Sequence, residues 1–168
     1  LDNEPLIRVR AQPLYHDRFV FITHERRDLD ARVSMTWSDA AKERLCLLSS
    51  DMQNRRIIDR AFETCGERPS PVVEANGLIA LMSHVRLGEW SSVVPQSLLL
   101  LTGISNGLRA LPMTDPAPDH AVGLVYPDRD PVSGLISTFI ATARRQNIQQ
   151  RIDAAWDRSA SLRSRSIG

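Results

Sequence analysis

Residue types that mark several classes of protein are scarce in this chain of 168 residues. Its two cysteines, Cys46 and Cys65, are too few for a disulfide framework, which favours a reducing, cytoplasmic environment. The leucine run at residues 98–101 is far too short to span a bilayer. The formal net charge of +1 gives no reason to expect binding to nucleic acid or to an anionic membrane. We therefore expect a globular domain without a membrane partner.

The N-terminal residues also lack the features of a secretion signal. No charged segment followed by an apolar stretch opens the chain. The first residue is Leu1 rather than methionine, so we expect the sequence to begin inside a longer protein. Lys42 is the only lysine among 21 basic residues, which indicates a GC-rich coding sequence more than a basic binding surface.

Sequence motifs of catalysis and of metal binding are absent as well. The chain contains no G-x-S-x-G, no P-loop and no G-x-G-x-x-G, and its four histidines do not cluster. No H-x-x-x-H or C-x-x-C spacing occurs, so we predict neither a metal nor another cofactor. An enzyme is an alternative that lacks a visible pair of nucleophile and base, and we expect the protein not to be an enzyme.

Short apolar segments and amphipathic segments alternate along the chain. The predicted strands cover residues 8–14, 19–22, 45–48, 71–75, 91–94, 108–113 and 121–126. Helices are predicted at residues 36–41, from Ser50 to Gly66, from Asn76 to Gly88, briefly after residue 96, and from Pro131 onward. Residues 44–95 therefore form a predicted βαβαβ unit, which implies a parallel sheet covered by helices.

Helical spacing also predicts which side chains lie inside. In the helix after Ser50 the apolar positions are Ile58, Ala61, Phe62 and Cys65, and the surrounding charges, including Arg55 and Asp59, are expected on a solvated face. The helix from Pro131 carries an apolar stripe formed by Val132, Leu135, Ile136, Phe139, Ile140 and Ala143. Residues 158–168, rich in serine and arginine, are predicted to form a flexible tail.

The candidate site lies where two predicted strands give way to helices. Ser50 and Gln53 have the spacing of a capping box, and Asn76 is expected to cap the next helix. The free N–H groups and positive dipole of a helix start suit a carboxylate or a phosphate. Asp51 could satisfy these donors itself, so an ordinary capped helix remains the alternative.

Several segments, taken in order, resemble the effector domain of LysR-type bacterial transcription regulators. Residues 14–22 resemble the segment where that family crosses between its two lobes. Residues 74–95, ending in Val-Val-Pro, are similar to its strand, helix, glycine and return strand, although Gly88-Glu89-Trp90 replaces the usual G-x-G. Residues 108–112 and 122–130 resemble its C-terminal strands.

The resemblance implies an α/β, type 2 periplasmic-binding-protein-like fold, with one complete Rossmann-like lobe and part of a second. The complete lobe would be residues 17–93, and the partial first lobe residues 1–16 and 94–145. Residues 146–168 would be a C-terminal helix extension and a flexible tail. Such a domain senses a small anionic metabolite, which we expect to be a carboxylate, in the cleft between the lobes.

The resemblance also implies partners and site residues. DNA would be bound only through an N-terminal winged helix-turn-helix outside these residues, and the intact regulator would be a homo-oligomer. A solute-binding protein of a transport system, which shares the fold, is the alternative. The implied ligand-binding residues are Ser49, Ser50, Asp51, Met52, Gln53, Asn54, Ala75 and Asn76 at the two helix starts, with Tyr15 and Val94 near the two crossings.

Overall fold

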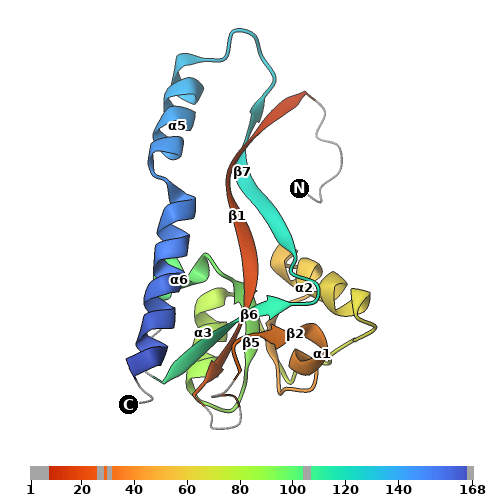
Figure 1. The fold of residues 1–168 in the computed structure, drawn as a ribbon. Coiled ribbons are helices and arrows are strands. Elements are labelled where there is room, and N and C mark those ends of the chain that lie inside the picture. The colour runs from red at the N-terminus through yellow and green to blue at the C-terminus, as the bar shows by residue number, and fades with distance from the viewer. Residues whose placement is uncertain (1–7, 26–28, 30–31, 104–106, 166–168) are drawn as a thin grey trace. The chain divides into compact units, whose positions relative to one another are not determined.

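A computed structural model describes residues 8–25, 29, 32–103 and 107–165 of the chain (Figure 1). The chain divides into two compact units. One unit is Arg18–Pro118, and the other combines the residues before it with those after it. The chain therefore passes between the units after Asp17 and again after Pro118.

The Arg18–Pro118 unit is a mixed sheet with helices. Its strands are the second half of β1 (Val9–His24), β2 (Met35–Thr36), β3 (Cys46–Leu48), β4 (Val73–Ala75), β5 (Ser92–Pro95) and β6 (Leu108–Thr114). Its helices are α1 (Trp37–Ala40), α2 (Gln53–Thr64), α3 (Leu78–Arg86) and α4 (Leu98–Thr102). β3 pairs in parallel with β4, and a parallel bridge from Leu45 to Ser91 joins β3 to the start of β5. The predicted βαβαβ unit is thus confirmed.

Beyond β5 the strand directions change. β1 runs antiparallel to both β5 and β6, and β6 runs parallel to β2. In this register Phe21 of β1 lies between Val93 of β5 and Leu111 of β6. β6 was expected to belong to the partial first lobe, within residues 94–145. Its pairing with β1 instead makes it part of the Arg18–Pro118 unit.

The main hydrophobic core of this unit lies on one face of the sheet, under α1 and α2. Trp37 and Phe62 are fully buried there, with ring centroids 4.9 Å apart in an edge-to-face arrangement. The indole N–H of Trp37 donates to the carbonyl of Pro116 at 2.7 Å, so its polar atom is satisfied. The predicted inward positions Ile58, Ala61 and Phe62 of α2 are all buried, which confirms the helical spacing.

The second unit consists of the first half of β1, β7 (Asp119–Pro127), α5 (Gly134–Arg145) and α6 (Ile148–Arg165). β7 pairs with β1. Polar contacts join helix to strand: Arg144 donates to the Gln12 side chain at 2.8 Å, and the His16 N–H donates to Gln149 at 2.8 Å. Ser133 caps α5 by accepting a hydrogen bond from the Ile136 N–H at 3.3 Å.

Two predictions about element boundaries were wrong. Residues 8–14 and 19–22 were expected to be separate strands, interrupted by Pro13 and the polar residues 15–18. β1 is instead one strand of 16 residues, which is continuous in Figure 1. In the described residues the first half of β1 pairs only with β7, and a strand edge tolerates proline. The long helix expected from Pro131 is two helices, α5 and α6, separated by Gln146 and Asn147.

The predicted flexible tail is also corrected for most of its length. α6 continues to Arg165, and only residues 166–168 of the predicted tail lie outside the described residues. Arginine, alanine and leucine, which alternate with serine in this segment, have good helix propensity. A biased composition therefore did not indicate disorder here.

Candidate functional site

The two predicted strand-to-helix junctions meet at one edge of the sheet. The Ser49 N–H donates to the Ala75 carbonyl at 2.9 Å, so the residue after β3 touches the last residue of β4. The Met52 N–H then donates to the Ser49 carbonyl at 3.0 Å and closes a turn over residues 49–52. Both junctions thus contribute to one local structure, as the parallel pairing of β3 and β4 requires.

The predicted caps of the two helices are wrong. α2 begins at Gln53, so Ser50 lies in the turn before the helix, and the N-cap residue is Met52. α3 begins at Leu78 with Gly77 as its N-cap, and Asn76 is exposed. Neither N-cap position makes a side-chain capping bond within the described residues. The amide groups at the start of α2 therefore do not depend on a serine cap.

The other predicted site residues divide between surface and interior. In the turn, Ser50, Asp51 and Gln53 are exposed, and Ser49, Met52 and Asn54 are partly buried. Ala75 is buried and Tyr15 is partly buried, close to the first passage between the units at Asp17. Val94 was expected beside the second crossing. It is instead fully buried in β5 opposite Val20, and the second passage follows Pro118.

A buried cation that was not predicted, the guanidinium of Arg55, lies beside this turn. Its side chain is only 9% exposed, so its expected place on a solvated face is wrong. One terminal nitrogen, Nη1, donates to the Leu48 carbonyl at 2.6 Å and to Glu74 Oε1 at 2.7 Å. The Nε atom donates to Asp59 Oδ1 at 2.8 Å. A signal existed, because Arg55 precedes the buried Ile58 and Phe62 by three and seven residues on the same helical stripe.

The partners of Arg55 keep it charged. Burial alone lowers the pKa of this guanidinium, because a low-dielectric environment disfavours the charged form. Hydrogen bonds from Arg55 to Glu74 and Asp59 outweigh that effect and raise the pKa above its ordinary value. The edge of the sheet therefore holds a permanent positive charge, balanced by two carboxylates that remain partly exposed.

The residue that departs from the usual G-x-G pattern, Trp90, packs against its surroundings in the same unit. Its ring meets the ring of His84 from α3 edge to face, with centroids 5.5 Å apart. The guanidinium of Arg44 lies 5.8 Å from the indole centroid, within the range of a cation–π contact. This position is therefore occupied by an aromatic cluster rather than by an open backbone.

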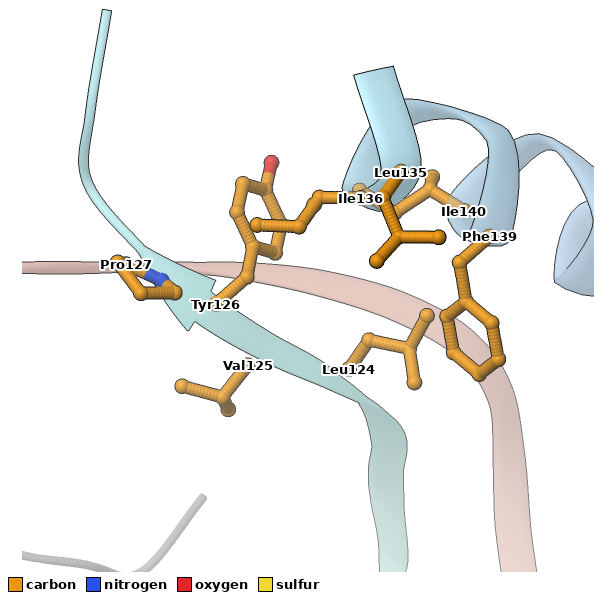
Figure 2. A pocket seen from close by; sticks show the side chains of 8 residues that line it. All are labelled: Leu124, Val125, Tyr126, Pro127, Leu135, Ile136, Phe139 and Ile140. Atoms are coloured by element: carbon orange, nitrogen blue, oxygen red, sulfur yellow. The ribbon is translucent and has the colours of Figure 1, made fainter. Parts of the chain in front are cut away.

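An apolar hollow lies in the second unit. It has a volume of about 410 Å³ and is lined by Leu124, Val125, Tyr126, Pro127, Leu135, Ile136, Phe139 and Ile140. Figure 2 shows Leu124 and Tyr126 on the side of β7 that faces α5. Four of the six residues of the predicted apolar stripe therefore line this hollow. Of these, Leu135 and Phe139 are 82% and 60% exposed.

Among the described residues, no three side chains of histidine, cysteine, aspartate or glutamate gather in a group that could hold a metal ion. Within the same residues, no helix has the length and hydropathy needed to cross a bilayer.

A model of the LysR substrate binding domain matches residues 2–147. The chain belongs to this family. LysR domains of this kind have a type 2 periplasmic-binding-protein-like fold, and this assignment favours a regulator domain over the solute-binding protein that shares the fold. The match extends across both units described above.

Solved structures with the fold of this LysR domain include three regulators. The reduced OxyR regulatory domain of Pseudomonas aeruginosa matches with a TM-score of 0.69 and 20% identity, over 84% of this chain and 68% of that one. HinK, a LysR family regulator of Pseudomonas aeruginosa, matches with a TM-score of 0.71 and 12% identity, over 89% and 52%. Full-length CbnR, complexed with its target DNA, matches with a TM-score of 0.66 and 12% identity, over 86% and 49%. The LysR chain described here therefore spans about half of the full-length regulators.

Proposed function

We propose that this LysR domain senses a small anionic metabolite, with a carboxylate group, at the edge formed by residues 49–54 and 75–76. The observation that supports this proposal is the hydrogen bond from Ser49 to Ala75, which joins two polar junctions into one structure. The start of α2 supplies N–H groups without a side-chain cap, and these favour an anion at this edge. Arg55 lies beside them, with its charge balanced by Glu74 and Asp59.

In the intact regulator, effector binding would control DNA binding and transcription. The DNA contact would come from a winged helix-turn-helix outside these residues, and the regulator would act as a cytoplasmic homo-oligomer. The structure of full-length CbnR, a complex with target DNA, supports DNA binding by full-length proteins of this fold. We expect residues 1–168 alone to bind no DNA sequence selectively, because the charge is near neutral and no recognition helix is apparent. Saturable, sequence-selective binding in a gel-shift titration would contradict this expectation.

The effector class can be tested by thermal shift with a set of small carboxylates and their neutral amides. We expect a carboxylate to raise the melting temperature and its amide to have little effect. A charge-assisted hydrogen bond contributes about 1.5–3 kcal/mol, so Ser50→Ala and Asn76→Ala should each weaken binding by about tenfold or more. Asp51→Asn should strengthen binding, because it removes a negative charge from the turn.

The structure provides a matched control for these variants. Ser50 does not cap α2, so Ser50→Ala should leave the melting temperature of the free protein unchanged. Ser83→Ala removes a similar hydroxyl from the exposed face of α3, where it donates to the Ile79 carbonyl, and should not affect binding. Equal affinities for Ser50→Ala, Asn76→Ala and the parent protein would exclude this edge as the effector site.

A further inference from the structure

The guanidinium of Arg55 links three parts of the fold that meet at the proposed effector edge. It holds the Leu48 carbonyl at the end of β3, the Glu74 carboxylate on β4 and the Asp59 carboxylate one turn further along α2. The three distances are 2.6, 2.7 and 2.8 Å, so all are short, charge-assisted hydrogen bonds.

The register of the sheet explains how this link is possible. Glu74 of β4 is paired with Leu47 of β3, so their side chains leave the same face of the sheet. Leu47 belongs to the core beneath α2, and Glu74 therefore emerges on the side of the sheet that α2 covers. Arg55 lies in the first turn of α2 and reaches across to both strands.

Of the three charged side chains in this link, Arg55 is the one that is held in the interior. The Arg55 side chain is 9% exposed, whereas Glu74 and Asp59 are 47% and 39% exposed. The guanidinium is thus buried, whereas the two carboxylates that balance its charge are partly exposed to solvent. The position of Arg55 is thus set by packing, and the strand ends are tied to it.

The remaining bonds in the turn do not replace this link. The Ser49 N–H holds Ala75 and the Met52 N–H holds Ser49, but both bonds are internal to the two junctions. Arg56 donates to the Asp51 carbonyl at 3.1 Å from an exposed position. Among the described residues, neither helix start has a side-chain cap that would connect it to the turn.

We propose that Arg55 is the positioning residue of the effector edge: by holding Leu48 and Glu74 together it orients the turn at residues 49–52 against the end of β4. This role rests on the proposed function of that edge. The arginine itself need not touch the effector. Nη1 binds the Leu48 carbonyl and Glu74, and Nε binds Asp59, so two nitrogens of one rigid plane hold three partners. The single nitrogen of a lysine ammonium does not provide this arrangement.

The test follows the two amides whose hydrogen bonds define the edge, those of Ser49 and Met52, by hydrogen exchange in the full chain. In Arg55→Met we expect both to exchange at least tenfold faster, together with a lower melting temperature. The Cys46 N–H, which donates to Ser91 on the other side of β3, is the internal control and should change in proportion to global stability only. Arg68→Met, at an 85% exposed side chain, is the control variant.

A double variant separates positioning from plain stability. Replacing both Arg55 and Glu74 with apolar residues, as Arg55→Met with Glu74→Leu, removes the charge pair and should restore much of the melting temperature. Exchange at Ser49 and Met52 should remain fast, because the side-chain link from the Leu48 carbonyl to Glu74 of β4 is then lost. Restoration of both stability and slow exchange would overturn the proposal, as would unchanged exchange in Arg55→Met.

Arg55→Lys gives a second route if Arg55→Met does not fold. It keeps the charge and loses the fork, so we expect intermediate exchange at Ser49 and Met52, and parent-like exchange would overturn the proposal. These measurements use no ligand, and a separate titration of the parent chain with acetate tests the effector site itself. Fast exchange in the variants without acetate binding in the parent would support the role of Arg55 in the turn and contradict the proposed function.

Discussion

Thr36 occupies the N-cap position of α1. Its hydroxyl accepts a hydrogen bond from the Asp39 N–H at 3.1 Å and caps α1. We expect Thr36→Ala to lower the free energy of unfolding by about 1 kcal/mol, the usual cost of a lost N-cap. Urea denaturation of Thr36→Ala and of the parent protein measures this difference in the free energy of unfolding.

The control for this variant is Thr64→Ala near the end of α2. The Thr64 hydroxyl donates to the Arg60 carbonyl within the same helix at 2.9 Å and caps no helix start. Its removal should leave the free energy of unfolding nearly unchanged. Equal losses in the two variants would show that the Thr36 hydroxyl acts through something other than the cap.

Asp39, in the first turn of α1, gives a prediction about pH. Hydrogen bonds from Arg32 and Lys42 lower the pKa of this carboxyl below its ordinary value of 3.8. A lowered pKa in the folded state stabilises the protein above the ordinary pKa, and this contribution is lost as the pH falls through the pKa of the folded state. Asp39→Asn should therefore reduce the loss of stability on acidification from about pH 5 to pH 2. Parallel stability curves for the two proteins in this range would contradict the assignment.

At the scale of elements, the pairing of β7 with β1 depends on a glycine. A Cβ atom on Gly123 would lie 2.2 Å from the Gln12 carbonyl oxygen and 2.8 Å from the Pro13 Cα, so the two strands would have to separate. We expect Gly123→Ala to destabilise this pairing by about 1–3 kcal/mol, the usual cost of overpacking. Hydrogen exchange across β7 should become faster.

Gly134 provides the opposite case in the same unit. It is the first residue of α5, and a Cβ there would meet nothing within 4 Å. Because alanine is the better helix former, Gly134→Ala should be neutral or stabilising by up to about 1 kcal/mol. A loss in Gly134→Ala as large as that in Gly123→Ala would mean that close approach of the strands is not the cause.

At the scale of the whole molecule, the two units differ in how much core they hold. Among the described residues, the buried apolar side chains lie in the Arg18–Pro118 unit except for Ile152 and Ala155, and α5 contains no buried residue. We expect slow hydrogen exchange in residues 44–95 and 108–114, and faster exchange in residues 8–14 and 119–145. Uniform protection across these ranges would contradict a difference in stability between the units.

The apolar hollow of the second unit predicts behaviour in solution. Exposed Leu135 and Phe139 should bind a hydrophobic dye and promote self-association, because burying such a side chain is worth about 1.5–3 kcal/mol. Leu135→Ser with Phe139→Ser should reduce both dye fluorescence and the sedimentation coefficient at high concentration. Val72→Ser, which removes a 56% exposed apolar side chain from the other unit, should leave both unchanged.

Hydrophobic spacing in the sequence predicted much of the fold of the Arg18–Pro118 unit. The inward positions Ile58, Ala61 and Phe62 of α2 were predicted from spacing, and all three are buried. The parallel unit over residues 44–95 was predicted too, and within it the Ser49–Ala75 hydrogen bond joins the two strand-to-helix junctions. Arg55 was missed because a charge was assumed to face solvent, although its place on the stripe of Ile58 and Phe62 indicated the interior.

The sequence by itself determined the alternation of strands and helices over residues 44–95 and the apolar positions that α2 buries, because hydrophobic periodicity is a property of neighbouring residues. The tertiary structure alone decided that β1 is one strand across Pro13, that β6 joins the unit of β3 to β5, and that Val94 lies in a core rather than at a crossing. Each of these depends on a partner distant in the chain. Strand pairing and the burial of a charge are settled by such partners, whose register and hydrogen bonds no local pattern contains.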